Sequence, residues 1–282
     1  MKAKNKDLTL KFDKLKRIVK DLGSVVVAYS GGLDSSFLLK VSNDVLGKKV
    51  LAVTSSSYSL PRRELEHARR VAKELGARHL ITKTREFANR NYLRNPRERC
   101  YYCKKELFLR LGQIARKYNK KTIVDGTNTD DDSDFRPGNK AKKEFAIRSP
   151  LREAGLTKND IRALARKLGF SFWDMPSFAC LSSRIPYNTK IDKKTLKRVE
   201  KAEDFLISLG FRQVRVRDFG RLAKIEVERQ EVKRLVTKSL GHQVTGYLKK
   251  LGYGQVAVDL EGYKTGSLNV DSRRYRLTKI SV

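Results

Sequence analysis

One short segment, SGGLDSS at residues 30–36, constrains the fold of this chain more than any other part of the sequence. It lies between an apolar run at residues 25–28 and a stretch of helical periodicity at residues 35–45, which predicts a strand, a loop and a helix in that order. The unit then repeats, with strands predicted at residues 50–54, 79–82 and 122–124 and helices at residues 8–22, 61–75, 101–118 and 157–168. Such alternation favours an α/β fold: a parallel sheet with helices on both faces and a ligand site at the carboxyl ends of its strands.

The pattern changes after Pro186. A helix predicted at residues 193–209 is followed by a strand pair at residues 214–217 and 223–227, and by a further strand near Val256. We therefore expect an α/β domain over residues 1–187 and a small α+β domain over residues 188–282.

The chain is strongly basic, because 63 Lys and Arg against 31 Asp and Glu give a formal net charge of +32. Its partners are therefore expected to be anionic, such as nucleotides, phosphorylated metabolites or RNA. No apolar run approaches the roughly 18 residues that cross a bilayer, and the basic N-terminus lacks the apolar core of a signal peptide. We expect a cytoplasmic protein without a membrane partner.

The glycine-rich segment has the composition of an anion site. Two adjacent glycines, Gly31 and Gly32, let backbone N–H groups converge on an anion, and Ser30 and Ser35 add hydroxyl donors at the positive end of the following helix. No Lys follows the glycines, so this is not a Walker A loop. A carboxylate beside phosphates requires a reason, and for Asp34 the reason is either Mg²⁺ binding or helix capping. The segment therefore predicts a site for pyrophosphate.

The same segment resembles the pyrophosphatase loop, SGGxDS, of the N-type ATP pyrophosphatases, which include the synthetases of GMP and NAD and the tRNA-thiolating enzymes. These enzymes adenylate a carbonyl or carboxylate oxygen and release pyrophosphate, so that a nucleophile can displace AMP. The resemblance implies that Asp34 helps to hold Mg²⁺. It also implies an ATP site formed by Ser30, Gly31, Gly32, Ser35, Thr54, Thr127 and Asn128.

The chain has three cysteines: Cys100 and Cys103 in a C-x-x-C pair, and Cys180 far downstream. The pair is predicted at the start of a helix, whose positive end favours thiolates. A zinc site needs four ligands, and no further Cys or His pair completes the set. A redox pair normally follows the first strand of a thioredoxin-like unit, where this chain has the glycine-rich loop instead. Three thiolates can hold a 4Fe-4S cluster with one open iron, so the cysteine count suits a cluster, with inert buried thiols as the alternative.

Several further segments resemble a more specific family. They are DGTN at residues 125–128, RPG at residues 136–138, SPL at residues 149–151, WDMP at residues 173–176 and ACLSSRIPY at residues 179–187. Together they resemble the sulfur transferases that build the nickel-pincer nucleotide, the LarE family, over roughly residues 20–230 and in the same order. One departure is Asn188, where many relatives have Gly, and Asn also tolerates a positive φ.

The resemblance implies a reaction on pyridinium-3,5-biscarboxylic acid mononucleotide. ATP adenylates one carboxylate, sulfur replaces AMP to give a thiocarboxylate, and the cycle repeats at the other carboxylate. In one branch of the family the thiol at the position of Cys180 gives up its own sulfur and becomes dehydroalanine. In the other branch three cysteines hold a 4Fe-4S cluster whose open iron carries a sulfide. Since this sequence has Cys100 and Cys103 as well as Cys180, we favour the cluster branch.

The resemblance also assigns roles to individual residues and partners. Cys180 and Asp34 would act in catalysis, and the candidates for binding the substrate phosphate are Arg184, Arg215 and Arg217. The substrate is a small nucleotide, the sulfur donor is not identified by the sequence, and a homo-oligomer is expected because relatives assemble into one.

A tRNA-thiolating enzyme is the main alternative, since that class also combines a pyrophosphatase loop with a C-x-x-C pair and a distant cysteine. The net charge of +32 favours RNA, because phosphate neutralisation dominates RNA affinity. However, the basic residues are spread along the chain, and no aromatic-rich RNA motif is present. An RNA-binding scaffold with a degenerate ATP fold is a third hypothesis, and the intact SGGLDSS loop argues against it.

Overall fold

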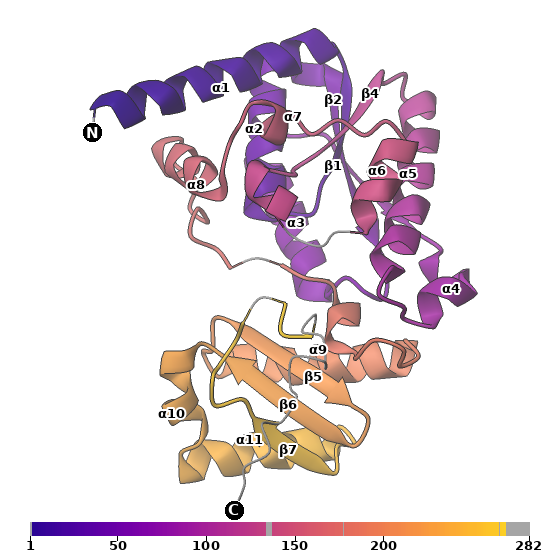
Figure 1. Cartoon of the computed structure of the whole chain (residues 1–282), viewed down its shortest axis with the longest axis vertical. Helices are drawn as coiled ribbons and strands as arrows, with labels where there is room; N and C mark the ends of the chain where they lie inside the picture. The colour runs from indigo at the N-terminus through magenta and orange to yellow at the C-terminus, as the bar shows by residue number, and fades with distance from the viewer. Residues whose placement is uncertain (1, 134–136, 177, 265, 269–282) are drawn as a thin grey trace, which may run out of the picture. The chain divides into compact units, whose positions relative to one another are not determined.

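The computed structural model describes residues 2–133, 137–176, 178–264 and 266–268, so Arg136 of the RPG segment lies outside the described residues. The chain divides into two compact units, Met1–Cys180 and Leu181–Val282 (Figure 1). The division comes before residue 187, the boundary expected from the sequence. The physical reason is that the short 3-10 turn Leu181–Arg184 belongs to the second unit, where Arg184 pairs with Glu203.

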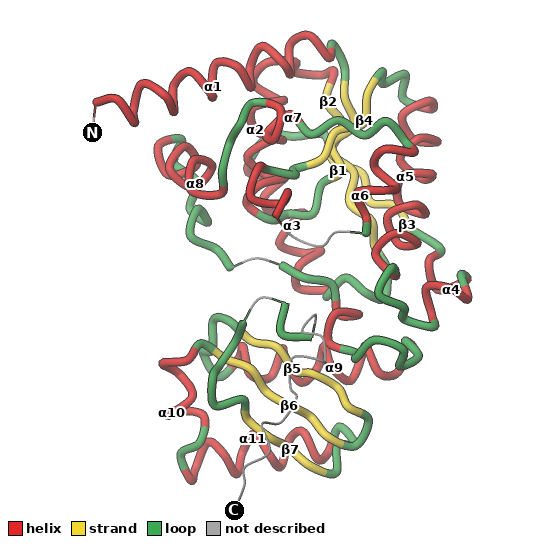
Figure 2. The backbone as a smooth tube through the Cα atoms, viewed as in Figure 1, coloured by secondary structure: helices red, strands yellow, loops and turns green. Residues whose placement is uncertain are grey.

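The first unit is built around a four-stranded sheet in the order β3-β2-β1-β4, and all neighbouring strands are parallel (Figure 2). The strands are β1 (Val25–Ala28), β2 (Val50–Ser56), β3 (His79–Lys83) and β4 (Thr122–Asp125). The predicted parallel sheet is therefore confirmed. Because each connection crosses from the end of one strand to the start of the next, the loops after β1, β2 and β4 meet at one edge of the sheet.

Helices cover both faces of this sheet. The helices of the first unit are α1 (Lys2–Leu22), α2 (Leu33–Leu46), α3 (Arg62–Glu74), α4 (Arg90–Leu93), α5 (Arg99–Lys117), α6 (Gly138–Glu144), α7 (Pro150–Glu153) and α8 (Lys158–Lys167), of which α4 packs against α5. Alternate residues of β1 enter different cores. Val25 and Val27 pack in a cluster with residues of α1, α2, α3, α7 and α8, whereas Val26 packs in a cluster with residues of α5 and α6. This two-sided burial explains why β1 is continuously apolar.

The second unit has a three-stranded sheet in the order β5-β6-β7, with β5 and β6 antiparallel and β6 and β7 parallel. Its elements are α9 (Lys193–Ser208), β5 (Val214–Phe219), β6 (Leu222–Val227), α10 (Val232–Leu235), α11 (Lys238–Lys250) and β7 (Gln255–Val258). Val214 and Val216 enter the apolar core with residues of α9, α10 and α11, so Arg215 and Arg217 project to the other face of the sheet. The predicted small α+β domain is confirmed.

Several boundaries differ from the sequence-based expectation. Helix α1 begins at Lys2 rather than near residue 8. The 3-10 helix Thr129–Ser133 was not expected either. The short helices α4, α6, α7 and α10 were not expected, because a helix of one or two turns is too short to show a clear apolar period. Within the described residues, the structure has no helix with the length and apolar character to span a bilayer.

Candidate functional site

The serines of the glycine-rich loop hold the loop in shape. The Ser30 amide donates to Oγ of Ser35 at 3.2 Å, and the Ser35 hydroxyl donates to the Gly32 carbonyl at 3.1 Å. The Gly32 amide in turn donates to Oγ of Ser30 at 3.3 Å. These bonds fold residues 30–35 into a compact turn at the start of α2.

Gly31 is required by its backbone angle and by its surroundings. Its φ is +79°, in the left-handed region, and a Cβ added to it would lie 2.7 Å from Cβ of Ala68 in α3. The loop therefore packs closely against α3, and only glycine fits at position 31.

Asp34, on the first turn of α2, is bound by two donors from other segments. Nζ of Lys158, the first residue of α8, lies 2.7 Å from both of its carboxylate oxygens. Nδ2 of Asn128 donates to Oδ2 of Asp34 at 3.3 Å. Burial raises the pKa of the Asp34 carboxyl, the Lys158 charge partly offsets this effect, and the nearby charge of Asp131 adds to it. The predicted metal-binding carboxylate thus lies next to a second carboxylate and a lysine that the sequence analysis did not identify.

The chain after β4 makes a close approach to the glycine-rich loop. A Cβ added to Gly126 would lie 2.8 Å from the Ser35 amide nitrogen and 3.0 Å from its Cα. The next residues are held internally: the Thr127 hydroxyl donates to Asp125 at 2.9 Å, and Oδ1 of Asn128 accepts from the Asp130 amide at 2.9 Å. The structure therefore brings Thr127 and Asn128 beside the loop, where Asn128 supports Asp34.

Beneath this turn lies a buried polar cluster that the sequence analysis did not identify. Nζ of Lys142 lies 3.1 Å from Oδ2 of Asp125 and 2.8 Å from the hydroxyl oxygens of Thr127 and Ser149. Burial by itself would raise the pKa of Asp125, but the charges of Lys142 and Lys104 and the hydrogen bonds from Ser149 and Lys142 outweigh it, so the pKa is lowered. The cluster fixes the end of β4 under the glycine-rich loop.

Thr54, near the end of β2, is also held internally. Its hydroxyl donates to the Tyr29 carbonyl at 2.8 Å and lies 2.8 Å from Nε2 of His79. The Thr54 side chain is buried, with only 2% of the residue exposed. Thr54 therefore ties β2 to the strand that leads into the loop.

The three cysteines lie in the same unit, and within the described residues none forms a disulfide. Cys100 and Cys103 are on the first two turns of α5. Burial raises the pKa of both thiols, and the charge of Cys180 raises both further, whereas Arg99 and Lys104 lower the pKa of Cys100. Cys180 therefore lies close enough to interact electrostatically with both residues of the C-x-x-C pair.

The segment that leads to Cys180 also touches the glycine-rich loop. A Cβ added to Gly32 would lie 3.8 Å from the ring of Phe178, and the Phe178 ring packs edge-on against His67 at a centroid distance of 5.7 Å. Two residues of chain span at most about 7 Å, so Cys180 follows closely on this contact. The loop and the three thiols are thus joined through one short segment.

Glu86 was not singled out in the sequence, yet it is buried beside Cys103. Only 2% of the residue is exposed, and its Oε2 atom has no hydrogen-bond partner among the described residues. Oε1 accepts a long hydrogen bond of 3.5 Å from Ser59. After burial and the charge of Cys180, the Glu86 charge is a further cause of the raised pKa of Cys103.

In the described part of the chain, no three Cys, His, Asp or Glu side chains lie close enough together to hold a single metal ion. Thiolates bound to the different irons of a cluster lie farther apart than thiolates bound to one ion, so a cluster places a different demand on the three cysteines.

The three arginines predicted to bind the substrate phosphate lie in the second unit and are buried. Arg184 pairs with Glu203, with 2.7 Å between Nε and Oε1, and Arg217 pairs with Glu226, with 2.7 Å between Nη2 and Oε2. Arg215 donates to the Val214 carbonyl, and its guanidinium lies 5.1 Å from the centre of the Tyr263 ring. Arg184 and Arg217 therefore already form ion pairs with carboxylates, which the sequence did not indicate.

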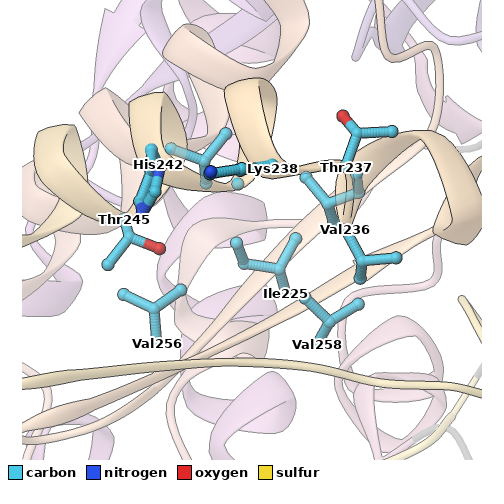
Figure 3. Close-up of a pocket in the computed structure, with 11 residues that line it drawn as sticks. Ile225, Val236, Thr237, Lys238, His242, Thr245, Val256 and Val258 are labelled. Carbon is cyan, nitrogen blue, oxygen red and sulfur yellow. The ribbon is translucent and has the colours of Figure 1, made fainter.

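The second unit also has a hollow of about 320 Å³ between α10, α11 and the sheet (Figure 3). Aliphatic side chains such as Ile225, Val256 and Val258 form much of its wall, and Lys238 and His242 of α11 contribute polar groups. Its described lining has neither a carboxylate nor a thiol. The groups suited to nucleotide activation and sulfur chemistry are those of the first unit.

The chain is similar in sequence to several known proteins. Residues 24–171 match the family model of the arginosuccinate synthase N-terminal HUP domain. The chain is 42% identical over 263 residues to an uncharacterized protein of Synechocystis sp., covering 93% of this chain and 98% of that protein. It is 37% identical over 252 residues to the pyridinium-3,5-bisthiocarboxylic acid mononucleotide synthase of Lactiplantibacillus plantarum, covering 89% of this chain and 91% of that enzyme. A glutamine-hydrolyzing GMP synthase component of Sulfurisphaera tokodaii is 28% identical over 55% of this chain and 45% of its own length.

Proposed function

Because this chain belongs to the LarE family, to which the Lactiplantibacillus plantarum pyridinium-3,5-bisthiocarboxylic acid mononucleotide synthase also belongs, we propose that it is an ATP-dependent sulfur transferase that makes the same bisthiocarboxylate. One observation supports the proposal most: all three cysteines lie in the unit that contains the pyrophosphatase loop, and Phe178, two residues before Cys180, packs against Gly32 of that loop. ATP activation and sulfur delivery both need groups of these kinds, and they need them near each other.

The reaction has two steps at each carboxylate. A carboxylate resists sulfide because its charge repels the nucleophile and oxide is a poor leaving group. In the first step a carboxylate oxygen attacks the α-phosphorus of ATP, and pyrophosphate leaves. In the second step sulfur attacks the activated carbonyl carbon, and AMP leaves with the electron pair of the C–O bond. The backbone amides of the loop and the Ser30 and Ser35 hydroxyls, once they exchange their hydrogen bonds within the loop for bonds to phosphate oxygens, stabilise the charge of the pyrophosphate.

We assign Mg²⁺ to Asp34. Mg²⁺ in nucleotide sites binds one or two carboxylates together with phosphate oxygens, and Asp34 has a second carboxylate, Asp131, within electrostatic reach. When bound, Mg²⁺ neutralises phosphate charge and makes pyrophosphate a better leaving group. Asn128 keeps the Asp34 side chain in position through its amide hydrogen bond.

We propose that Cys100, Cys103 and Cys180 hold a 4Fe-4S cluster. The donor set fits in number, because three thiols suffice for such a cluster. Burial raises the pKa of the Cys100 thiol, and the positive charges of Arg99 and Lys104 partly offset this effect. When bound, such a cluster supplies an open iron that can carry a sulfide. The sacrificial alternative needs only Cys180: its thiolate displaces AMP, and elimination then leaves the sulfur on the product and dehydroalanine in the chain.

Arg184, Arg215 and Arg217 remain our candidates for binding the substrate phosphate. Arg184 forms an ion pair with Glu203 and Arg217 with Glu226, and the charge of Glu203 also acts on Arg215. A homo-oligomer and a cytoplasmic location also remain proposals.

Two variants separate the activation step from the sulfur step. The anaerobically purified protein is incubated with ATP, Mg²⁺, pyridinium-3,5-biscarboxylic acid mononucleotide and sulfide, and pyrophosphate and product are measured. Asp34→Asn should release no pyrophosphate. Cys180→Ser should still exchange pyrophosphate into ATP but form no thiocarboxylate. Thiocarboxylate formed by Cys180→Ser would contradict the role of this thiol.

Iron and sulfide analysis with mass spectrometry after turnover then distinguishes the sources of sulfur. We expect iron, acid-labile sulfide and an intact Cys180, and loss of the iron in Cys100→Ala. Iron-free protein that loses H₂S from Cys180 in one turnover would support the sacrificial route. AMP formation that depends on tRNA rather than on the mononucleotide would reject the small substrate.

A further inference from the structure

The Lys158 ammonium forms an ion pair with Asp34, the carboxylate that we assign to Mg²⁺. Its Nζ lies 2.7 Å from Oδ1 and 2.7 Å from Oδ2 of Asp34, so the ammonium contacts both oxygens. The two side chains are 23% and 22% exposed, so the pair is open to solutes. A metal ion that binds Asp34 through either oxygen must displace or shift this ammonium.

The second neighbour of Asp34 is also oriented as a donor. Nδ2 of Asn128 points to Oδ2 of Asp34 at 3.3 Å, while Oδ1 of Asn128 accepts from the Asp130 amide at 2.9 Å. The amide oxygen that a metal would prefer is therefore bound to the backbone. Asp34 is thus bound by hydrogen-bond donors on two sides.

The Lys158 side chain can leave Asp34 without disturbing its helix. The start of α8 is fixed by a capping box between Thr157 and Asp160, with hydrogen bonds of 3.1 Å in each direction. The Lys158 amide also donates to Oδ2 of Asp130 at 2.8 Å. The backbone at Lys158 is therefore fixed independently of the ammonium, which ends a flexible four-carbon chain.

We propose that Lys158 acts as a placeholder cation at Asp34, which excludes free Mg²⁺ and yields only to Mg²⁺ that arrives with ATP. The inference rests on the proposed function. Free Mg²⁺ can bind the Asp34 carboxylate only if the Lys158 ammonium gives up its ion pair with that carboxylate. A metal bound to a triphosphate brings anionic oxygens that replace the lost partner of Lys158, so the exchange then costs no unpaired charge. Metal and nucleotide therefore bind together.

The placeholder also has a consequence for the chemistry. With the ammonium present, Asp34 does not repel the first phosphate to approach the loop, because its charge is already balanced. Lys158 is thus a positioning residue of the activation step, and the sequence hides it because one lysine among 63 basic residues carries no signal.

The test uses Mn²⁺ alone as the probe, followed by electron paramagnetic resonance of the free ion, with and without α,β-methylene-ATP. The variants are Lys158→Met, Lys158→Arg, which keeps the charge, and Lys167→Met, a matched control at an exposed position of the same helix. We expect Lys158→Met to bind Mn²⁺ without nucleotide at least tenfold more tightly than the unaltered protein. Lys158→Arg and Lys167→Met should behave like the unaltered protein, and adding Asp34→Asn to Lys158→Met should abolish the gain.

Equal nucleotide-free affinity for Mn²⁺ in Lys158→Met and the unaltered protein, with nucleotide binding intact, would overturn the placeholder and leave the proposed function standing. Failure of the unaltered protein to bind α,β-methylene-ATP at any Mn²⁺ concentration would instead reject the proposed function, and the placeholder with it. Thermal unfolding of each variant checks that the fold is retained.

Discussion

Arg184 and Glu203 form an ion pair in which neither side chain is exposed, with 2.7 Å between Nε and Oε1 and 3.0 Å between Nη2 and Oε2. Oε1 of Glu203 also accepts from the Val216 amide of β5 at 3.0 Å. The pair therefore links the 3-10 turn Leu181–Arg184, helix α9 and the sheet of the second unit.

This arrangement predicts a structural effect for Arg184. Arg184→Met should lower the free energy of opening at the Val216 amide by about 3–5 kcal/mol, because it removes the guanidinium that forms the buried ion pair with Glu203. The double variant Arg184→Met with Glu203→Gln should recover much of the loss, since Gln still accepts from Val216. Native-state hydrogen exchange measures both. A normal exchange rate in the single variant, together with a raised KM for the substrate, would mean that Arg184 serves the substrate instead.

Gly126 is predicted to control nucleotide affinity through contact with Ser35. In Gly126→Ala the new Cβ would meet the Ser35 backbone at 2.8 Å, and backbone atoms cannot rotate away. The pyrophosphatase loop must then shift, so ATP affinity measured by calorimetry should fall at least tenfold. The control is Gly246→Ala in α11, where a Cβ meets nothing within 4 Å. That variant should keep its ATP affinity and gain up to about 1 kcal/mol of stability. Unchanged affinity in Gly126→Ala would refute this close packing.

Asp125 should give the first unit a dependence on acid pH. Its pKa in the folded protein is lowered, so its pairing stabilises the fold above the unfolded pKa of about 3.9, and this stabilisation is lost as the pH falls through and below that value. The free energy of unfolding, measured with urea between pH 6 and pH 3, should therefore fall less steeply with decreasing pH in Asp125→Asn than in the unaltered protein. At pH 7 the same variant should be less stable by about 3–5 kcal/mol, because Lys142 loses its buried partner. Asp44→Asn, at an exposed pair with Lys40, serves as the control and should leave both quantities nearly unchanged.

His79 should titrate below its usual range. Burial lowers its pKa from 6.5, and the nearby charge of Arg69 lowers it further. Because the Thr54 hydroxyl already donates to the Tyr29 carbonyl, its oxygen accepts from His79, which fixes the neutral ring with its proton on Nε2. Nitrogen-15 NMR should show this tautomer at pH 7 and a midpoint below pH 6.5. Protonation then favours the unfolded state, so stability should fall as the pH drops through 6.5. A dominant Nδ1–H form would contradict the assignment, and Thr54→Val should weaken the preference.

The main elements of the fold could be predicted from local pattern. The apolar run at residues 25–28 became β1, and the helical pattern at residues 157–168 became α8. Both signals lie within a few residues of sequence, where propensity and periodicity act. The short helices and the position of the unit boundary depend on contacts between distant residues, such as Arg184 with Glu203, and no local pattern encodes them.

The candidate site divides in the same way. The sequence by itself determined the chemical groups: a glycine-rich turn between strand and helix, one carboxylate within it, and three thiols. These groups can be assigned from the sequence because glycine allows backbone angles that other residues avoid, Mg²⁺ prefers carboxylate ligands, and three thiolates suffice for a cluster. Only the tertiary structure decided the partners: Lys158 lies 124 positions from Asp34, and Asn128 lies 94 positions from it. A charge in a sequence has no partner until the chain folds, because an ion pair depends on a distance of a few ångströms that parallel strands and their helices set.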